Sequence, residues 1–315
     1  MTERDAPIGP LLPLYVVVVN WNLPEETIAC VQSVHANQIS DMEIVVMDNG
    51  STDCSVEMLK MHLGNTIQLL ESSVNLGFAA GANLGIQHAL CKGAQSVLLL
   101  NNDTIVDAGM VPHLLSTMAN RPAAGIVAPV IYYHDNPGRV WQIGSREHCW
   151  LPIPVDVGSR MLSDMEQAPF RLDYVTACGM LVRRLVWETV GLFDVCYFMY
   201  FEDADFCRRV RHAGFEILCA PRARMWHRVS LSARKQRPGS RYAEAWGRAH
   251  FYRTHHHGPS ATLTMAHVLL KAVCITLRDL LKWQWRLCLS LWRGTFDGLL
   301  DRPSRAVSYW SPEKT

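Results

Sequence analysis

Short apolar runs alternate with helix-spaced apolar positions through the first half of the chain. Strands are predicted over residues 14–19, 43–47, 67–70, 97–100 and 126–130. Between them, apolar residues recur at helical spacing, as at Ile28, Val31 and Val34. Strands and helices that alternate this closely predict an α/β fold with a parallel sheet covered on both faces.

The second half has a different pattern. Residues 131–172 read as irregular, residues 173–182 as strands, residues 202–212 as a helix and residues 215–219 as a strand. A loop carrying His227 is expected next, and the chain reads as helical from about residue 241. We therefore expect a tail (1–13), two halves of one domain (14–130 and 131–240) and a helical segment (241–315).

Polar residues follow the predicted strands where they end. Asp48 ends one strand and Asp103 ends another. Because ligands bind beyond the carboxyl ends of strands in open α/β sheets, both are candidate site residues. Asp48 can accept hydrogen bonds from a nucleobase imide or a ribose hydroxyl, although an ordinary turn explains it equally well. Asn75 and Asn83 can reach the same base, or can serve as a loop cap and a satisfied helix residue.

Two further groups carry candidate chemistry. Asp103 and His227 are plausible ligands for a divalent ion that holds a nucleotide diphosphate, and a histidine suits Mn2+ better than Mg2+. Glu202, Asp203 and Asp205 follow an aromatic run. The helix dipole favours acids at a helix start, which explains part of this cluster. A rigid carboxylate in a cleft also suits a general base, and an aspartate of ordinary pKa, about 3.9, is ionised at neutral pH.

Composition narrows the class of protein. The 315 residues carry a formal net charge of +1, which does not favour a nucleic-acid partner. The ten cysteines form no close pairs, so buried thiols in a reducing compartment are expected. No secretory signal is evident, and no apolar stretch reaches the roughly 18 residues of a membrane span.

The C-terminal residues 261–300 mix leucines, basic residues and tryptophans. This pattern predicts helices that lie on a membrane surface, or helices packed on the protein's own core or on a second subunit. The run at residues 255–257, three histidines, is expected to be a solvated helix end rather than a metal site.

An ordered set of motifs resembles glycosyltransferase family 2, and most closely its bacterial rhamnosyltransferase-like branch. The motifs are VVVNWN (17–22), DNGSTD (48–53), NLGFA (75–79), LNNDT (100–104), GMLVR (179–183), GLFD (191–194), YFEDADF (200–206) and WH (226–227). The resemblance covers roughly residues 14–257. It implies a GT-A fold, in which a Rossmann-like mixed central sheet is flanked by helices, here with a C-terminal helical extension.

The resemblance also implies roles for individual residues. Asp203 matches the catalytic base, while Asp103 and His227 match the residues that hold a Mg2+ or Mn2+ ion with the diphosphate. The nucleotide-binding residues would be Asn20, Asp48, Asn75, Asn83, Asn101 and Asn102. The acceptor-site residues would be Gly179, Glu202 and Asp205. Residues 14–130 would then be the nucleotide-sugar-binding half and residues 131–240 the acceptor half.

One position departs from the family pattern. Asn101 stands where the first acid of the family's D-x-D motif is expected, so Asp103 supplies the only carboxylate of that motif. Asn101 can still bind a ribose hydroxyl or a metal-bound water.

The implied function is an inverting transfer of a sugar from a nucleoside diphosphate to a hydroxyl of a glycan or lipid-linked acceptor, in cell-surface polysaccharide synthesis. The expected sugar is L-rhamnose, with dTDP-rhamnose as its donor. The alternative is transfer of galactose, glucose or an N-acetylhexosamine. The expected location is the inner face of the cytoplasmic membrane, with a homo-oligomer possible.

Two other classes of protein fit the sequence less well. A non-catalytic nucleotide-sugar-binding assembly protein would use the same scaffold, but it has no need of Asp103, Asp203 and His227. A nucleotide-dependent oxidoreductase would carry G-x-G-x-x-G after the first strand, where residues 20–22 read NWN.

Overall fold

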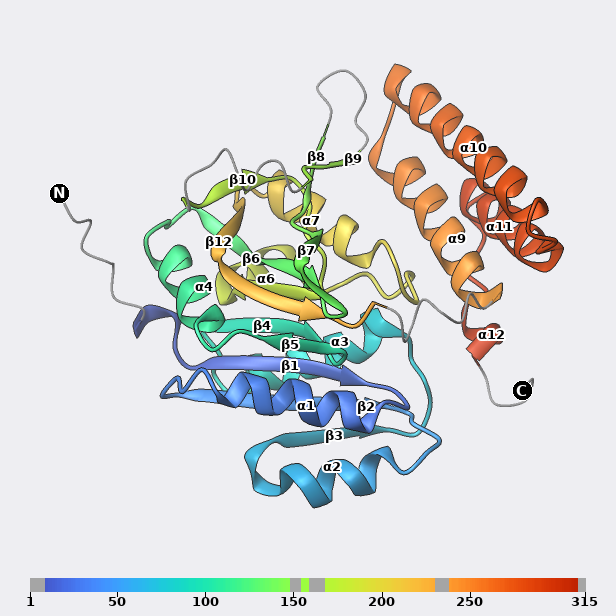
Figure 1. The fold of residues 1–315 in the computed structure, drawn as a ribbon. Helices are drawn as coiled ribbons and strands as arrows, with labels where there is room; N and C mark the ends of the chain where they lie inside the picture. Colours follow the sequence, from blue (N-terminus) through green and yellow to red (C-terminus); the bar gives the residue numbers. More distant parts are fainter. Residues whose placement is uncertain (1–8, 148–153, 159–167, 230–237, 311–315) are drawn as a thin grey trace.

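A ten-stranded mixed sheet forms the centre of the computed structural model, which describes residues 9–147, 154–158, 168–229 and 238–310 (Figure 1). The strand order is β10-β12-β6-β11-β4-β1-β2-β3, with β5 paired to β12 and β7 paired to β6. The strands are β1 (Leu14–Asn20), β2 (Met42–Asn49), β3 (Gln68–Ser72), β4 (Ser96–Asn101), β5 (Thr104–Val106), β6 (Ala124–Tyr133), β7 (Asn136–Gln142), β10 (Phe170–Leu172), β11 (Gly179–Arg183) and β12 (Glu216–His227). A separate pair comprises β8 (Ser145–Glu147) and β9 (Pro154–Asp156).

The helices cover both faces of this sheet and extend beyond it. They are α1 (Pro24–His35), α2 (Ser55–Leu63), α3 (Phe78–Cys91), α4 (Met110–Ala119), α6 (Arg184–Val190), α7 (Glu202–His212), α9 (Pro238–His255), α10 (Pro259–Leu280), α11 (Trp285–Leu299) and α12 (Val307–Trp310). Short 3-10 turns are η1 (Gly9–Leu11) and η2 (Gly64–Thr66).

Alternate residues of the central strands enter two different cores. Val17 of β1 packs in a core with α3, α6 and α7, whereas Val16 and Val18 pack in a core with α1, α2 and α4. Both cores are almost fully buried, which explains why these strands read as continuous apolar runs rather than as alternating ones. The predicted α/β class with helices on both faces is confirmed.

Parallel pairing occurs in two parts of the sheet, among the first-half strands and between β6 and β12. β1 pairs in parallel with β2 and β4, and β2 pairs in parallel with β3. β11 then runs antiparallel between β4 and β6, so that it joins the two expected halves in one sheet. A boundary at residue 130 falls inside β6.

The second half contains more strand than its sequence pattern predicts. Residues 131–172, expected to be irregular, include β7, β8, β9 and β10. The strand expected over 215–219 continues to His227, so the expected loop around that histidine is wrong. Its polar and charged residues obscure the strand pattern, and pairing with β6 and β5 supplies the missing stabilisation.

The three long C-terminal helices form a block beside one end of the sheet (Figure 1). Gly294 and Gly298 of α11 let that helix approach α9 closely, since a Cβ on either glycine would lie 2.4 or 2.6 Å from a backbone oxygen of α9. The hydroxyl of Tyr242 on α9 donates a 2.9 Å hydrogen bond to Asp297 of α11. The predicted helical character of the C-terminal segment is confirmed.

Candidate functional site

Strand order brings Asp103 and His227 together. Asp103 follows β4, and His227 ends β12 directly opposite Thr104 of β5. The His227 Nε2 lies 3.0 Å from the Asp103 Oδ1, and both side chains are buried. The sequence separates these residues widely, so this proximity comes from the antiparallel pairing of β12 with β5.

The donor atoms of this pair fit a divalent ion that also binds the ligand. The Asp103 Oδ2 and the His227 Nδ1 are buried without a partner in the described structure. No group of three or more His, Cys, Asp and Glu side chains arranged for a metal exists among the residues described. A metal held here by Asp103 and His227 would therefore take its remaining ligands from phosphate oxygens and water, as Mg2+ and Mn2+ do at nucleotides.

Asp203 lies at the start of α7, on a backbone turn that few residues adopt. Tyr200 and Phe201, just before the helix, have φ values of 68° and 73°. Left-handed conformations at two consecutive non-glycine residues store strain, which is common at functional sites. The half-buried Asp203 carboxylate accepts hydrogen bonds from the backbone N–H of Ala204 at 2.8 Å and of Ala177 at 3.3 Å. The turn and these bonds fix its position.

Burial raises the pKa of Asp203 above its usual range, against the lowering effect of its backbone hydrogen bonds. Burial and the charge of Asp203 together raise the pKa of Glu202 well above its usual value. The Glu202 Oε2 has no hydrogen-bond partner within the described residues. Both shifts favour a single negative charge on this pair of carboxyl groups, and a base of raised pKa accepts a proton more readily at neutral pH.

One cavity of about 710 Å3 joins these groups. The expected site residues in its lining are Asn75, Asn101, Asn102, Asp103, Glu202, Asp203 and His227. Aromatic side chains of Trp21, Trp141 and Phe198 form apolar parts of the wall. The cavity therefore combines a strand-end polar group, a carboxylate at a helix start and aromatic surface.

The sequence profile described as "Glycosyltransferase like family 2" matches residues 10–246 of this chain. The chain belongs to this family. All seven of the lining residues named above lie inside the matched range.

Curated relatives of family 2 share about a quarter of their residues with the chain. The hexosyltransferase Agl10 of low-salt glycan biosynthesis in Haloferax volcanii is 25% identical over 65% of this chain and 63% of its own length. The N-acetylglucosaminyl-diphospho-decaprenol L-rhamnosyltransferase of Mycobacterium tuberculosis is 26% identical over 61% of this chain and 68% of its own. The dTDP-rhamnosyl transferase RfbF of Shigella flexneri is 25% identical over 69% of each chain. The matched part spans about two thirds of these relatives.

Solved structures share the fold. The mannosyltransferase PcManGT from Pyrobaculum calidifontis, in complex with GDP-Man and Mn2+, aligns with a TM-score of 0.59 at 13% identity over 95% of this chain and 90% of its own. GalNAc-T7 with UDP, GalNAc and Mn2+ aligns with a TM-score of 0.56 at 19% identity over 70% of this chain and 44% of its own. The fold implied by the family resemblance is confirmed.

Two expected nucleotide-binding residues, Asn20 and Asp48, are absent from the cavity lining. The Asn20 Nδ2 donates a 2.7 Å hydrogen bond to the Asp48 Oδ2, which also accepts one from the Ser51 hydroxyl at 2.6 Å. The Asn20 Oδ1 accepts a 2.7 Å bond from the Thr27 hydroxyl. Asp48 and Asn20 are 1% and 0% exposed, and their hydrogen bonds connect the ends of β1 and β2.

Asn83 and Gly179 are also absent from the cavity lining. The amide of Asn83 exchanges two hydrogen bonds with the backbone of Phe193, at 2.9 and 3.1 Å, which uses its polar groups. Gly179 is buried in β11, where a Cβ would lie 2.5 Å from the Met225 sulfur and 3.0 Å from Pro129. In this structure both residues make packing contacts, because the helix and strand that carry them turn these positions into the core.

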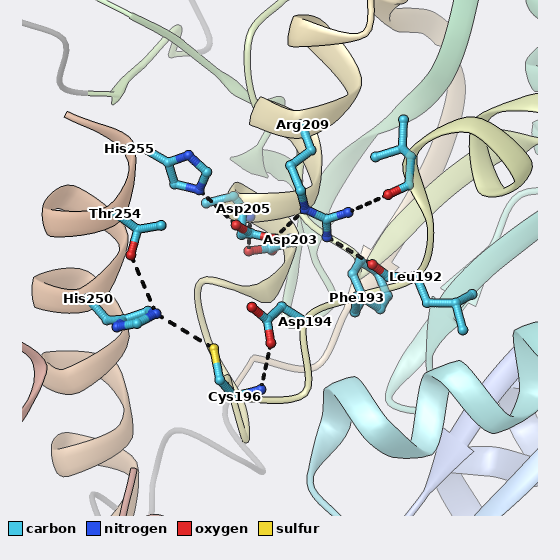
Figure 2. Close-up of polar contacts among 12 residues, drawn as sticks. Leu192, Phe193, Asp194, Cys196, Asp203, Asp205, Arg209, His250, Thr254 and His255 are labelled. Atoms are coloured by element: carbon cyan, nitrogen blue, oxygen red, sulfur yellow. Dashed lines mark hydrogen bonds and ion pairs between the residues drawn. The ribbon is translucent and has the colours of Figure 1, made fainter. Parts of the chain in front are cut away.

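Asp205, expected in the acceptor site, contacts two basic side chains (Figure 2). Its side chain is 4% exposed and lies outside the cavity lining. The Asp205 Oδ2 accepts a 2.7 Å bond from the Arg209 Nε, and its Oδ1 lies 2.7 Å from the His255 Nε2 on α9. Burial opposes the charge, but His255 and Arg209 outweigh burial and lower the pKa of Asp205. This carboxylate ties α7 to α9.

The expectation of a solvated histidine run holds for His257, which is exposed, but is wrong for His255 and His256. His255 bonds Asp205, and His256 is 4% exposed against Tyr252 and Phe251. Burial and the charge of Arg208 lower the pKa of His256 to about 4, so it is neutral at physiological pH. α9 is packed against the sheet domain through this end.

The C-terminal helices also form part of the cavity wall, which the sequence pattern does not predict. Its lining includes Glu244, Arg248, Tyr252, His267, Lys271 and Trp310. Arg248 and Tyr252, and likewise His267 and Lys271, are spaced one helical turn apart, which is the one local sign that they share a face. Nothing in the sequence indicates which surface that face meets.

Proposed function

We propose that the chain transfers a sugar, with inversion, from a nucleoside diphosphate to an acceptor hydroxyl. The observation that carries this proposal is the single cavity lined by Asp103, His227 and Asp203. Family membership supports the reaction class, and the rhamnosyl names of two relatives support L-rhamnose from dTDP-rhamnose. Transfer of another hexose is the alternative.

Asp203 is the proposed general base. As the acceptor oxygen bonds to the anomeric carbon, its proton passes to the Asp203 carboxylate, and the bond from that carbon to the diphosphate breaks. The diphosphate leaves with the electron pair. A positioned base contributes about 10²- to 10⁴-fold in rate.

Asp103 and His227 would hold the divalent ion, which stabilises the negative charge on the leaving diphosphate. Asn101 and Asn102 line the cavity beside them. The Asn102 amide donates a 3.0 Å hydrogen bond to Thr27, so it is held in place before a ligand binds. Asn75 also lines the cavity and is oriented by Gly77, whose N–H donates to its Oδ1 at 2.8 Å.

A donor screen tests the proposal. Thermal stability is measured with dTDP-, UDP- and GDP-sugars in the presence of Mn2+ or Mg2+, and the stabilising donor is then assayed for hydrolysis and transfer. Asp203→Asn retains donor binding and loses turnover if Asp203 is the base. Donor binding with no turnover in the unmodified chain would favour a non-catalytic assembly protein.

We also propose that the acceptor is lipid-linked and that the C-terminal helices rest on the inner face of the cytoplasmic membrane. α10 has a mean hydropathy of 1.5 over an 18-residue window that is 17% buried, so by length and composition alone it is apolar enough to cross a membrane. Leu277, Leu281 and Trp283 are 59%, 84% and 91% exposed. Their contact with lipid would remove this apolar surface from water.

Vesicle flotation tests this location. The variant Leu277→Gln/Leu281→Gln/Trp283→Gln is compared with Met61→Gln, which changes a residue 77% exposed on α2. Flotation lost only in the first variant supports the proposal, and equal flotation of both contradicts it.

A further inference from the structure

Basic side chains from the C-terminal helices gather on one wall of the cavity. Arg248 extends from α9, and His267 and Lys271 extend from α10. All three lie beyond residue 246, where the family match ends. They come from the C-terminal part of α9 and from α10, which lie outside the range matched by the family profile.

The wall carries more positive than negative charge. Arg248 is buried and pairs with Glu244, which is the single acid among the described residues of α9 and α10 that line the cavity. Packing around the Lys271 ammonium and the charge of Arg248 lower the pKa of Lys271. Burial, Lys271 and Arg248 likewise lower the pKa of His267. Arg248 and Lys271 are close enough to repel one another, and an anion between them would relieve that repulsion. His267, neutral near pH 7 because its pKa is lowered, adds a ring N–H donor beside them.

The cationic wall adjoins the proposed base. The Arg248 guanidinium lies over the ring of Phe201, 5.8 Å from its centroid, and Phe201 directly precedes α7. A Cβ on Gly247 would lie 2.8 Å from the Tyr200 carbonyl oxygen, so α9 packs tightly on this turn. Because Asp203 takes its proton from the acceptor, the acceptor must occupy this part of the cavity.

We propose that Arg248, His267 and Lys271 form a subsite for a phosphate or diphosphate carried by the acceptor. This inference rests on the proposed transfer and names the acceptor's chemical class. The leaving diphosphate of the donor has its own place at Asp103 and His227, so the second cluster serves a second anion. α10 also exposes Leu270 and Val273, at 64% and 42%, beside Lys271. An acceptor with an apolar chain behind its diphosphate satisfies both surfaces.

Direct binding to the full chain tests the subsite apart from catalysis. Calorimetry is run in EDTA with decyl diphosphate, with inorganic pyrophosphate and with vesicles of phosphatidylglycerol. EDTA removes the divalent ion and so suppresses binding at Asp103 and His227. We expect decyl diphosphate to bind more tightly than pyrophosphate, and the double variant His267→Gln/Lys271→Gln to raise its Kd about tenfold or more, as loss of charge-assisted hydrogen bonds does.

Two controls separate the outcomes. Lys282→Gln removes a charge just after α10, outside the cavity lining, and should leave the Kd unchanged. Asp103→Ala should also leave it unchanged, whereas it should abolish metal-dependent donor binding if the proposed function is right. The subsite is refuted if decyl diphosphate does not bind, if its Kd is unchanged in the double variant, or if Asp103→Ala weakens it. The subsite is also refuted if the double variant weakens the binding of vesicles but not of decyl diphosphate. His267 and Lys271 would then contact lipid headgroups.

Discussion

Asp205→Asn tests whether Asp205 is a structural carboxylate, distinct from the proposed base Asp203 on the same helix. Asp205 contacts Arg209 and His255, each at 2.7 Å, and is 4% exposed (Figure 2). Removing one partner of a buried ion pair costs about 3–5 kcal/mol. Arg209 keeps hydrogen bonds to the carbonyls of Val190 and Leu192 and is 27% exposed. Both features reduce the loss of folding free energy in the variant. We therefore expect unfolding to become easier by about 2–3 kcal/mol.

The assay is urea unfolding at several pH values together with donor turnover. Because the pKa of Asp205 is lowered in the folded protein, its contribution is complete above the ordinary value of 3.8 and is lost as the pH falls below it. The stability difference between Asp205→Asn and the unmodified chain should therefore be constant near neutral pH and shrink below about pH 4.

Asp203→Asn, two residues earlier on the same helix, is the matched comparison. It removes a buried negative charge beside Glu202 and should leave stability unchanged or raised while turnover falls. The reasoning is refuted if Asp205→Asn loses turnover a hundredfold with stability intact, because Asp205 would then act in the acceptor site.

Three further results are expected. Asp203→Asn should lower transfer about 10²- to 10⁴-fold with donor Kd unchanged, and the transfer rate of the unmodified chain should fall on acidification with a midpoint above the ordinary aspartate value of 3.8, because burial raises the pKa of Asp203. Asp103→Ala and His227→Ala should each abolish metal-dependent donor binding in a titration with Mn2+, and unchanged binding in both would remove the metal assignment. Asn83→Ala should destabilise the chain by about 2–3 kcal/mol in urea unfolding, because two buried backbone groups of Phe193 lose their partner; weaker donor binding with normal stability would restore Asn83 to the nucleotide site.

Local pattern was sufficient for the first half of the fold. Apolar runs of strand length, separated by helix-spaced apolar residues, predict a parallel sheet covered by helices. The spacing of apolar residues within each element shows which of its faces is buried. The polar residues at strand ends follow from the same reading, and Asn101 to Asp103 do line the cavity. The sequence pattern predicts only the first part of β12, because the polar residues of its second part are stabilised by pairing with strands distant in sequence.

The sequence by itself determined the fold class, the order of the motifs and the acids at the start of α7. Tertiary structure alone decided which polar residues reach the cavity: it joined Asp103 to His227, turned Asn83, Gly179 and Asp205 inward, and placed the C-terminal helices on the cavity wall. The physical reason is that periodicity records whether a side chain is buried, whereas its partner depends on strand order and helix docking, which no local pattern encodes.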